Sequence, residues 1–241
     1  MFAVRSAATI VTSCIAVVGS ACTGDGDGAG DERRAAARAR ADQVREVMLE
    51  AGYSEEVGEV GARLAAGPGA TYRAVYESTS GSETTLVTVT NDPPRRRVDI
   101  DPEAQVSRTT ITEDTRTVTC TGLDDRWTCV EGAPGPELAE LSDAALTDAV
   151  LDLARAVEEY VVAIEEQEVA GVAGTCLVVT PRADVEDPSA APAATVCVSR
   201  QGIPLLVERA GTRLRAVEVT DDIPSGAFDP PAEISPDNDP G

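Results

Sequence analysis

The chain contains no histidine and no lysine, so every basic side chain is an arginine. Histidine is the commonest general base and metal ligand, and lysine is needed for Schiff-base chemistry and for P-loop phosphate binding. Aromatic residues make up only 3% of the chain, which leaves few platforms for stacking nucleotide bases. We therefore expect no enzymatic activity, no metal and no cofactor.

The charge is strongly one-sided, because 42 acidic side chains outnumber 20 arginines and give a formal net charge of −22. Such a surface repels phosphate backbones, so nucleic acid is not an expected partner. It also gains nothing from anionic lipid headgroups, so attachment to a membrane requires an anchor. Acidic pairs such as Asp99 with Asp101 and Asp221 with Asp222 are interpreted as solvated charges in a chain this acidic.

The N-terminus has the pattern of a leader that ends at a lipid anchor. Residues 7–18 form a mildly apolar run that is too short to span a bilayer but suits a signal peptide. Small residues at 19–21 then precede Cys22, which resembles the bacterial lipobox, whose cysteine carries diacylglycerol and a fatty acid such as palmitate. Cys14 is an alternative lipid site, and an ordinary signal peptide is a third interpretation. We predict a lipoprotein on the outer face of the cell membrane, anchored through Cys22.

Four cysteines remain once Cys14 leaves with the leader and Cys22 takes lipid. An even number in an exported chain implies two disulfides, for which three pairings are possible. Local geometry favours neighbours on adjacent strand-like runs, because such pairs lie within disulfide reach. The predicted disulfides are therefore Cys120–Cys129 and Cys176–Cys197.

The periodicity of the apolar residues changes three times along the chain. Helical spacing predicts helices over 31–51 and 55–66, and a third near 142–159. Alternation with a period of two predicts strands between and after them. The predicted strands are 71–77, 83–90, 95–101, 104–112, 114–121, 126–131, 160–164, 168–170, 175–180, 194–200, 203–208 and 214–220.

This order of elements predicts an α+β fold. The expected architecture is a strongly curved, mostly antiparallel sheet, an open half-barrel of about ten or more strands, with helices covering its concave side. The predicted organisation is a signal peptide (1–21), a lipidated cysteine with a flexible acidic tether (22–31), N-terminal helices (32–66), the curved-sheet domain (67–232) and a disordered tail (233–241).

Several short stretches between residues 70 and 232 carry a family resemblance. They are TYRAVY at 71–76, RRRVDI at 95–100, EVAGV at 168–172, GIPL at 202–205 and VEVTDDIP at 217–224. They resemble the LolA/LolB lipoprotein-carrier superfamily and its actinobacterial lipoprotein relatives of the LppX/LprG kind. The resemblance implies an open barrel with a helical lid that holds acyl chains, and it brings no catalytic residues.

We therefore expect an extracytoplasmic lipoprotein that binds or carries a hydrophobic ligand such as lipid in an apolar cavity. The alternative is a cell-envelope protein-binding or sensing module with a filled core and no ligand. Alternation alone does not tell which face of each strand lines the cavity. The candidate lining residues are Val75, Leu86 or Val87, Val89, Ile100, Leu146, Val150, Leu153, Val179 and Leu206.

Overall fold

The computed structural model describes residues 28–102, 106–114, 116–123, 126–132, 143–155, 157–182, 193–209 and 211–235. The predicted leader, the predicted lipid site Cys22, its alternative Cys14 and most of the predicted tether lie outside these ranges.

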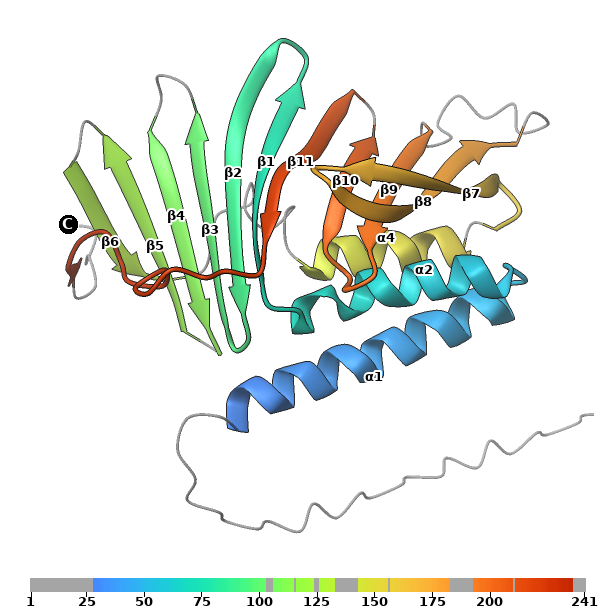
Figure 1. Ribbon diagram of the computed structural model, residues 1–241, viewed down its shortest axis with the longest axis horizontal. Coiled ribbons are helices and arrows are strands. Elements are labelled where there is room, and N and C mark those ends of the chain that lie inside the picture. The colour runs from blue at the N-terminus through green and yellow to red at the C-terminus, as the bar shows by residue number, and fades with distance from the viewer. Residues whose placement is uncertain are drawn as a thin grey trace, which may run out of the picture.

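One 12-stranded sheet forms most of the molecule, in the order β12-β6-β5-β4-β3-β2-β1-β11-β10-β9-β8-β7 (Figure 1). Neighbouring strands pair antiparallel, except β12, which pairs parallel to β6. The strands are β1 (Tyr72–Ser80), β2 (Glu83–Asp92), β3 (Arg95–Pro102), β4 (Ser107–Glu113), β5 (Arg116–Leu123), β6 (Arg126–Glu131), β7 (Tyr160–Val169), β8 (Val172–Pro181), β9 (Ala194–Ser199), β10 (Pro204–Arg209), β11 (Thr212–Thr220) and β12 (Ile234–Ser235).

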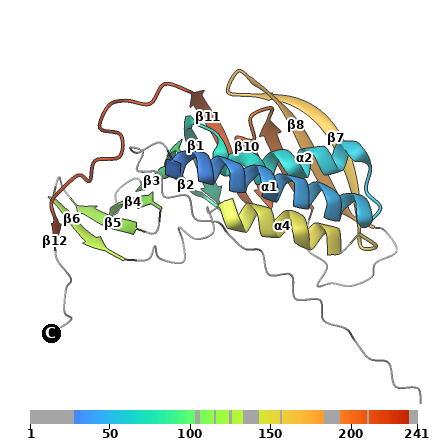
Figure 2. The same ribbon diagram turned by 90° about the horizontal axis from the view of Figure 1, so that it is seen from below.

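Three α-helices in the described residues lie on one side of the sheet: α1 (Gly28–Glu50), α2 (Glu55–Ala66) and α4 (Asp143–Arg155). The hydroxyl of Ser54 accepts a hydrogen bond from the Val57 N–H and caps the start of α2. Seen from below, the sheet arches around the helices, which occupy its concave side (Figure 2). The predicted fold class is therefore confirmed.

The helix layer is joined to the sheet at the β2–β3 turn. Asn91 is buried at the end of β2, and its amide donates hydrogen bonds to the carbonyls of Pro68 (3.2 Å) and Ala70 (2.6 Å). These carbonyls belong to the 3₁₀ turn η1 (Gly67–Gly69) and to the residue after it. Arg33 of α1 donates to the carbonyl of Pro94, at 2.6 Å. The turn thus holds both N-terminal helices against the sheet.

Two large core clusters lie in the described residues, and a smaller third surrounds the Cys120–Cys129 disulfide. The first joins β1–β3 to β8–β10 and is centred on Tyr76, Val87 and Leu205. The second lies between the helices and β8–β9, where Met48, Val60 and Val150 pack against Leu177 and Val198. Burial of these side chains is the main force that holds the helices in the concavity.

Besides shifts of a few residues at element ends, the structure differs from the predicted elements at three places. Helix α1 begins at Gly28, ahead of the predicted start, and there Gly30 packs so closely on the Pro93 carbonyl that a Cβ atom would lie 2.7 Å from it. Strand β7 runs unbroken to Val169, because its polar residues continue the ladder with β8. Residues Ile234–Ser235, in the stretch where disorder is expected, form β12. Helix α4 occupies the position predicted for the central helix.

Candidate functional site

Both predicted disulfides are present. Cys120 and Cys129 face each other across β5 and β6, with Cα atoms 4.0 Å apart, and Cys176 and Cys197 face each other across β8 and β9, at 3.9 Å. The closed loops span 9 and 21 positions, which correspond to about 2.6 and about 3.3 kcal/mol of chain-entropy stabilisation. Disulfides form and persist in oxidising compartments, so the protein is extracytoplasmic.

The strand residues predicted to line a cavity do not share one face of the sheet. Val89 is directly opposite Ala74, and Val75 is opposite Thr88, so Val75 points to the other face from Val89. Ile100 is on the face of Val89, since it pairs with Val87 beside Val89 on β2. Val87 is buried, whereas its neighbour Leu86 is exposed.

The remaining candidates are placed as follows. Val150 and Leu153 of α4 pack into the helix–sheet core cluster. Leu206 is buried in the other cluster, and Val179 is half-buried opposite Val162. The side chain of Leu146 lies outside the described part of the structure. An apolar cavity lined by these residues stays a prediction.

Tyr53 is an ionisable side chain between α4 and the loop before α2. Burial raises the pKa of Tyr53, while Arg182 nearby acts in the opposite direction. The Tyr53 hydroxyl donates a hydrogen bond to the Leu153 carbonyl at 3.1 Å, so it ties α4 to the loop before α2. Within the same ranges no three His, Cys, Asp or Glu residues are grouped closely enough to hold a metal ion. No helix there is long and apolar enough to cross a membrane.

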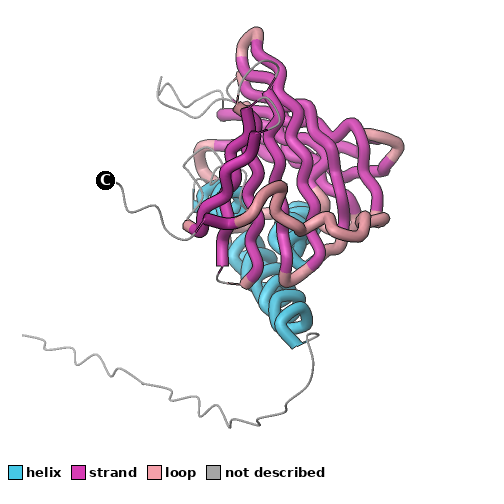
Figure 3. The backbone as a smooth tube through the Cα atoms, turned by 90° about the vertical axis from the view of Figure 1, so that its left-hand side faces the viewer, coloured by secondary structure: helices cyan, strands magenta, loops and turns pink. Residues whose placement is uncertain are grey.

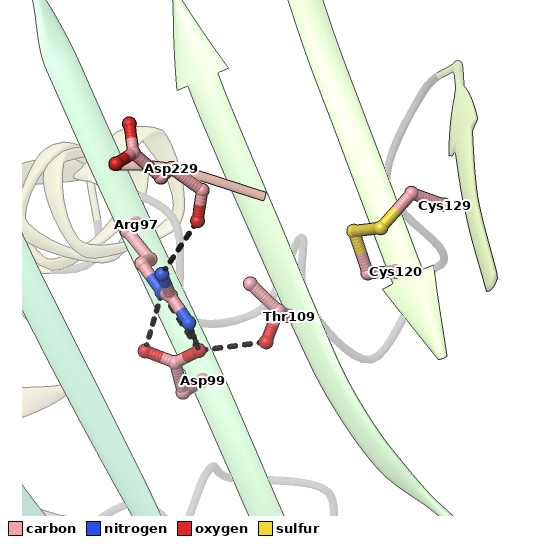
Figure 4. Close-up of a disulfide and its surroundings, with 6 residues drawn as sticks. All are labelled: Arg97, Asp99, Thr109, Cys120, Cys129 and Asp229. Atoms are coloured by element: carbon pink, nitrogen blue, oxygen red, sulfur yellow. Dashed lines mark hydrogen bonds and ion pairs between the residues drawn. A yellow bond between two sulfur atoms is a disulfide. The ribbon is translucent and has the colours of Figure 1, made fainter. Parts of the chain in front are cut away.

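The C-terminal strap, residues 221–235, crosses β3–β6 on the face away from the helices, as the red segment in Figures 1 and 2. Figure 3 shows the backbone from the β6 end of the sheet. Arg97 of β3 holds it by donating from Nη1 to the carbonyls of Ala227 and Asp229, each at 3.1 Å. The Arg97 Nε lies 2.9 Å from both carboxylate oxygens of Asp99, and Thr109 donates to that carboxylate at 2.7 Å (Figure 4). The arginine is thus oriented by its neighbours before it contacts the strap.

The far end of the strap caps one edge of the sheet. Ala232 and Ile234 pack on the Cys120–Cys129 disulfide beside Trp127. Ile234 and Ser235 then pair with β6 as the parallel strand β12. The strap shows that this sheet binds an extended polypeptide segment at its edge, here one from its own chain.

The opposite edge of the sheet is β7, which pairs with β8 along all ten of its residues. No second strand pairs with β7 in the described residues. In an antiparallel pair about half of the backbone N–H and C=O groups point away from the partner, so they remain available along this edge. Val169 at its end is buried in the core next to β11, and the accessible part of β7 is 161–168.

The accessible part of β7 has two halves of different chemistry. Residues 161–164 are apolar, and residues 165–168 are three glutamates and a glutamine. Glu166 accepts a hydrogen bond from Thr175, whereas Glu165 and Glu168 make no ion pair with any residue that the structure describes. The edge therefore changes from apolar to acidic along its length.

No protein-family model and no curated protein matches the sequence. Similar solved structures include MucB, with 16% identity and a TM-score of 0.49 over 70% of this chain and 60% of that chain. They also include MucB in complex with MucA(peri), with 17% identity and a TM-score of 0.44 over 68% and 54%. The Pseudomonas aeruginosa MucA/MucB complex matches at 18% identity and a TM-score of 0.44 over 68% and 56%. This chain spans less than two thirds of each, and the likeness is too weak to transfer a function.

Sequence reasoning missed both edges of the sheet. It divided β7 into two short strands, although the run from Tyr160 to Val169 contains no glycine, proline, asparagine or aspartate that would break it. That absence is the signal that could have revealed the long edge strand. The role of Arg97 has no such signal, because its strap acceptors are backbone carbonyls, which every residue carries.

Proposed function

We propose that this protein is a lipid-anchored module on the outer face of the cell membrane that binds an extended segment of another envelope protein. The segment adds as a strand beside β7. The observation that carries the proposal is the contrast between the two edges: the chain's own strap caps β6, while β7 has no strand partner in the described residues. An added strand would satisfy the outward backbone groups of β7 and bind mainly through main-chain hydrogen bonds.

The packing of the concave side supports a binding module over a lipid carrier. Met48 and Val198 are completely buried, and Val44 is 1% exposed, at the centre of the helix–sheet interface. Side chains from both layers occupy the space in which a carrier would hold acyl chains. A hydrophobic ligand remains the competing proposal, and it requires a void elsewhere on the concave face. Catalysis has no part in either proposal.

The anchor would place the module close to the bilayer. Only residues 23–27 separate Cys22 from the start of α1. An extended chain of this length spans about 20 Å. The partner segment would accordingly belong to a membrane protein or to another protein held near the membrane.

Site-directed photo-crosslinking in the native host tests the binding edge. A photoreactive amino acid replaces Val161 on β7 or, as the control, Leu86 on β2, which are 50% and 46% exposed. We expect one defined protein adduct from position 161 and none from position 86. The same adducts from both positions, or no adduct from 161, would contradict strand addition at β7.

Two further measurements test the ligand and the anchor. Native mass spectrometry of the protein purified from its host should show no bound lipid beyond the anchor, and a co-purifying lipid would favour the carrier. Cys22→Ala should move the protein out of the membrane fraction, whereas Cys14→Ala should leave it there. A membrane-bound Cys22→Ala variant would contradict the proposed anchor.

A further inference from the structure

We infer that the segment recognised at β7 is basic in its N-terminal half and apolar in its C-terminal half, and that it binds antiparallel to β7. The juxtaposition of an apolar and an acidic half along one unpaired edge carries this inference. It rests on the proposed strand addition and gives the chemistry of the partner.

The acidic half of β7, residues 165–168, favours basic side chains on both faces of the added strand. Glu165 points to the face of Cys176, whereas Glu166 and Glu168 point to the opposite face. Arg63 donates to Thr175, which in turn donates to Glu166, so this carboxylate already has a polar neighbour inside the protein. Glu165 and Glu168 have no ion-pair partner in the described residues, and side chains of opposite charge on an adjacent strand stabilise pairing.

The apolar half selects β-branched side chains. Val161 and Ala163 lie exposed on one face, and Val162 and Ile164 lie half-buried on the other, at the border of the helix–sheet core. Apolar side chains of an added strand would extend both of these surfaces and bury them. A charged side chain at these positions would lose water without gaining a partner.

The direction follows from the surrounding ladder. Strands β7, β8 and β9 pair antiparallel, and antiparallel pairing is slightly more stable per residue than parallel pairing. In this direction the N-terminal half of the segment lies beside residues 165–168, and its C-terminal half lies beside 161–164. The order along the segment is therefore basic first and apolar second.

A second copy of β7 fits this edge poorly. Full antiparallel overlap of residues 161–168 with themselves places the acidic half of each copy beside the apolar half of the other. Centring the pair on the acidic half instead brings Glu165 beside Glu168 of the other copy, and like charges repel. The edge is thus unsuited to self-pairing and suited to a segment of complementary charge.

The test measures peptide binding by fluorescence anisotropy, with the disulfide-intact mature protein. Three synthetic peptides match residues 161–168 in length. The first has arginines in its N-terminal half and valines and threonines in its C-terminal half, the second has the same composition in reverse order, and the third has glutamates in place of arginines. We expect the first to bind tightest, the reversed peptide to bind more weakly and the acidic peptide not to bind. The affinity of the first peptide should fall as salt is added.

Variants then locate the binding site. The Glu165→Lys/Glu168→Lys variant should bind the first peptide about tenfold more weakly. Glu165→Gln/Glu168→Gln, which keeps the shape of both side chains, should show a smaller loss. Glu46→Lys/Glu50→Lys on the exposed face of α1 adds the same charge elsewhere and should bind as the unchanged protein does. Trp127 fluorescence checks that each variant is folded.

Several results would overturn the inference. Equal binding of the basic and acidic peptides would refute the charge preference while leaving strand addition intact, and tighter binding of the reversed peptide would refute the direction. Equal losses in the β7 and α1 variants would place the site elsewhere. If the peptide-free protein sediments as a dimer, a second copy of the chain occupies the β7 edge, and the inference is wrong. If none of the three peptides binds, the inference is refuted as well. The crosslinking experiment at position 161 tests strand addition at β7 independently.

Discussion

Replacing Arg97 by glutamine should release the C-terminal strap from the sheet. The Arg97 guanidinium contacts two strap carbonyls and the Asp99 carboxylate, and the two side chains are only 21% and 29% exposed. Hydrogen bonds to charged groups contribute about 1.5–3 kcal/mol each, and partial solvent access reduces this. We expect the strap to lose about 2 kcal/mol of its attachment, which raises its local opening equilibrium about thirtyfold.

Hydrogen exchange followed by mass spectrometry measures this directly. Peptides that cover residues 225–235 should exchange faster in Arg97→Gln, whereas peptides from β8 and β9 should exchange at an unchanged rate. Trp127 is the single tryptophan of the chain and packs beside the strap, so its emission should shift to longer wavelength. The two signals together distinguish local release of the strap from global unfolding.

Arg116→Gln is the matched control. Arg116 belongs to β5, two strands away from β3. Its ion pair with Glu131, at 3.4 Å, is exposed, with the two side chains 51% and 56% accessible. Such surface pairs contribute about 0–1 kcal/mol. Equal exchange at 225–235 in the two variants would refute the reasoning, because it would mean that Arg97 holds the strap no better than a surface arginine does.

Three other substitutions, the first with a matched control, test local packing and titration. Gly122→Ala should destabilise the protein by about 1–3 kcal/mol in urea unfolding, because its Cβ atom would lie 2.6 Å from the indole of Trp127. Gly132→Ala is the control and should leave stability unchanged, because a Cβ atom there would have no atom within 4 Å. Thr110→Val should stabilise by about 1 kcal/mol, since the buried Thr110 hydroxyl has no hydrogen-bond partner; no gain in melting temperature would contradict this. Burial raises the pKa of Tyr53 above 10.0, so the unfolded chain releases that proton first and stability falls as pH rises past about 10. Tyr53→Phe should reduce this alkaline loss in unfolding measured from pH 9 to 11, and an unchanged loss would exclude Tyr53 as its source.

The fold class and the disulfides were predictable because both depend on local patterns. Alternating residues mark strands wherever one face is buried, and each cysteine pair sits on strands that are adjacent in the chain. The long edge strand β7 was missed because a polar stretch resembles a loop when its ladder partner is not known. Only the register with β8 shows that residues 165–168 stay in the sheet.

The face that each strand residue occupies was not predictable for a different reason. The register between β1 and β11 shifts between Val75 and Tyr76, and that between β10 and β9 shifts between Pro204 and Leu206. Each irregularity adds a residue to one strand and changes the alternation beyond it. Leu206 follows the extra residue Leu205 on β10, so it cannot be assigned to a face from its own strand alone. At the other shift the extra residue is Val217 on β11, and the alternation of β1 against β2 stays regular.

The cap that β12 places on β6 also sets how many molecules can join edge to edge. A sheet with two unpaired edges can add copies at both ends without limit, as in a fibril. Here the chain's own strap pairs with Cys129 and Val130 of β6, so strand addition is obstructed at that end, whereas β7 has no strand partner in the described residues. An edge obstructed at one end only disfavours open-ended polymerisation while leaving one binding event possible at β7.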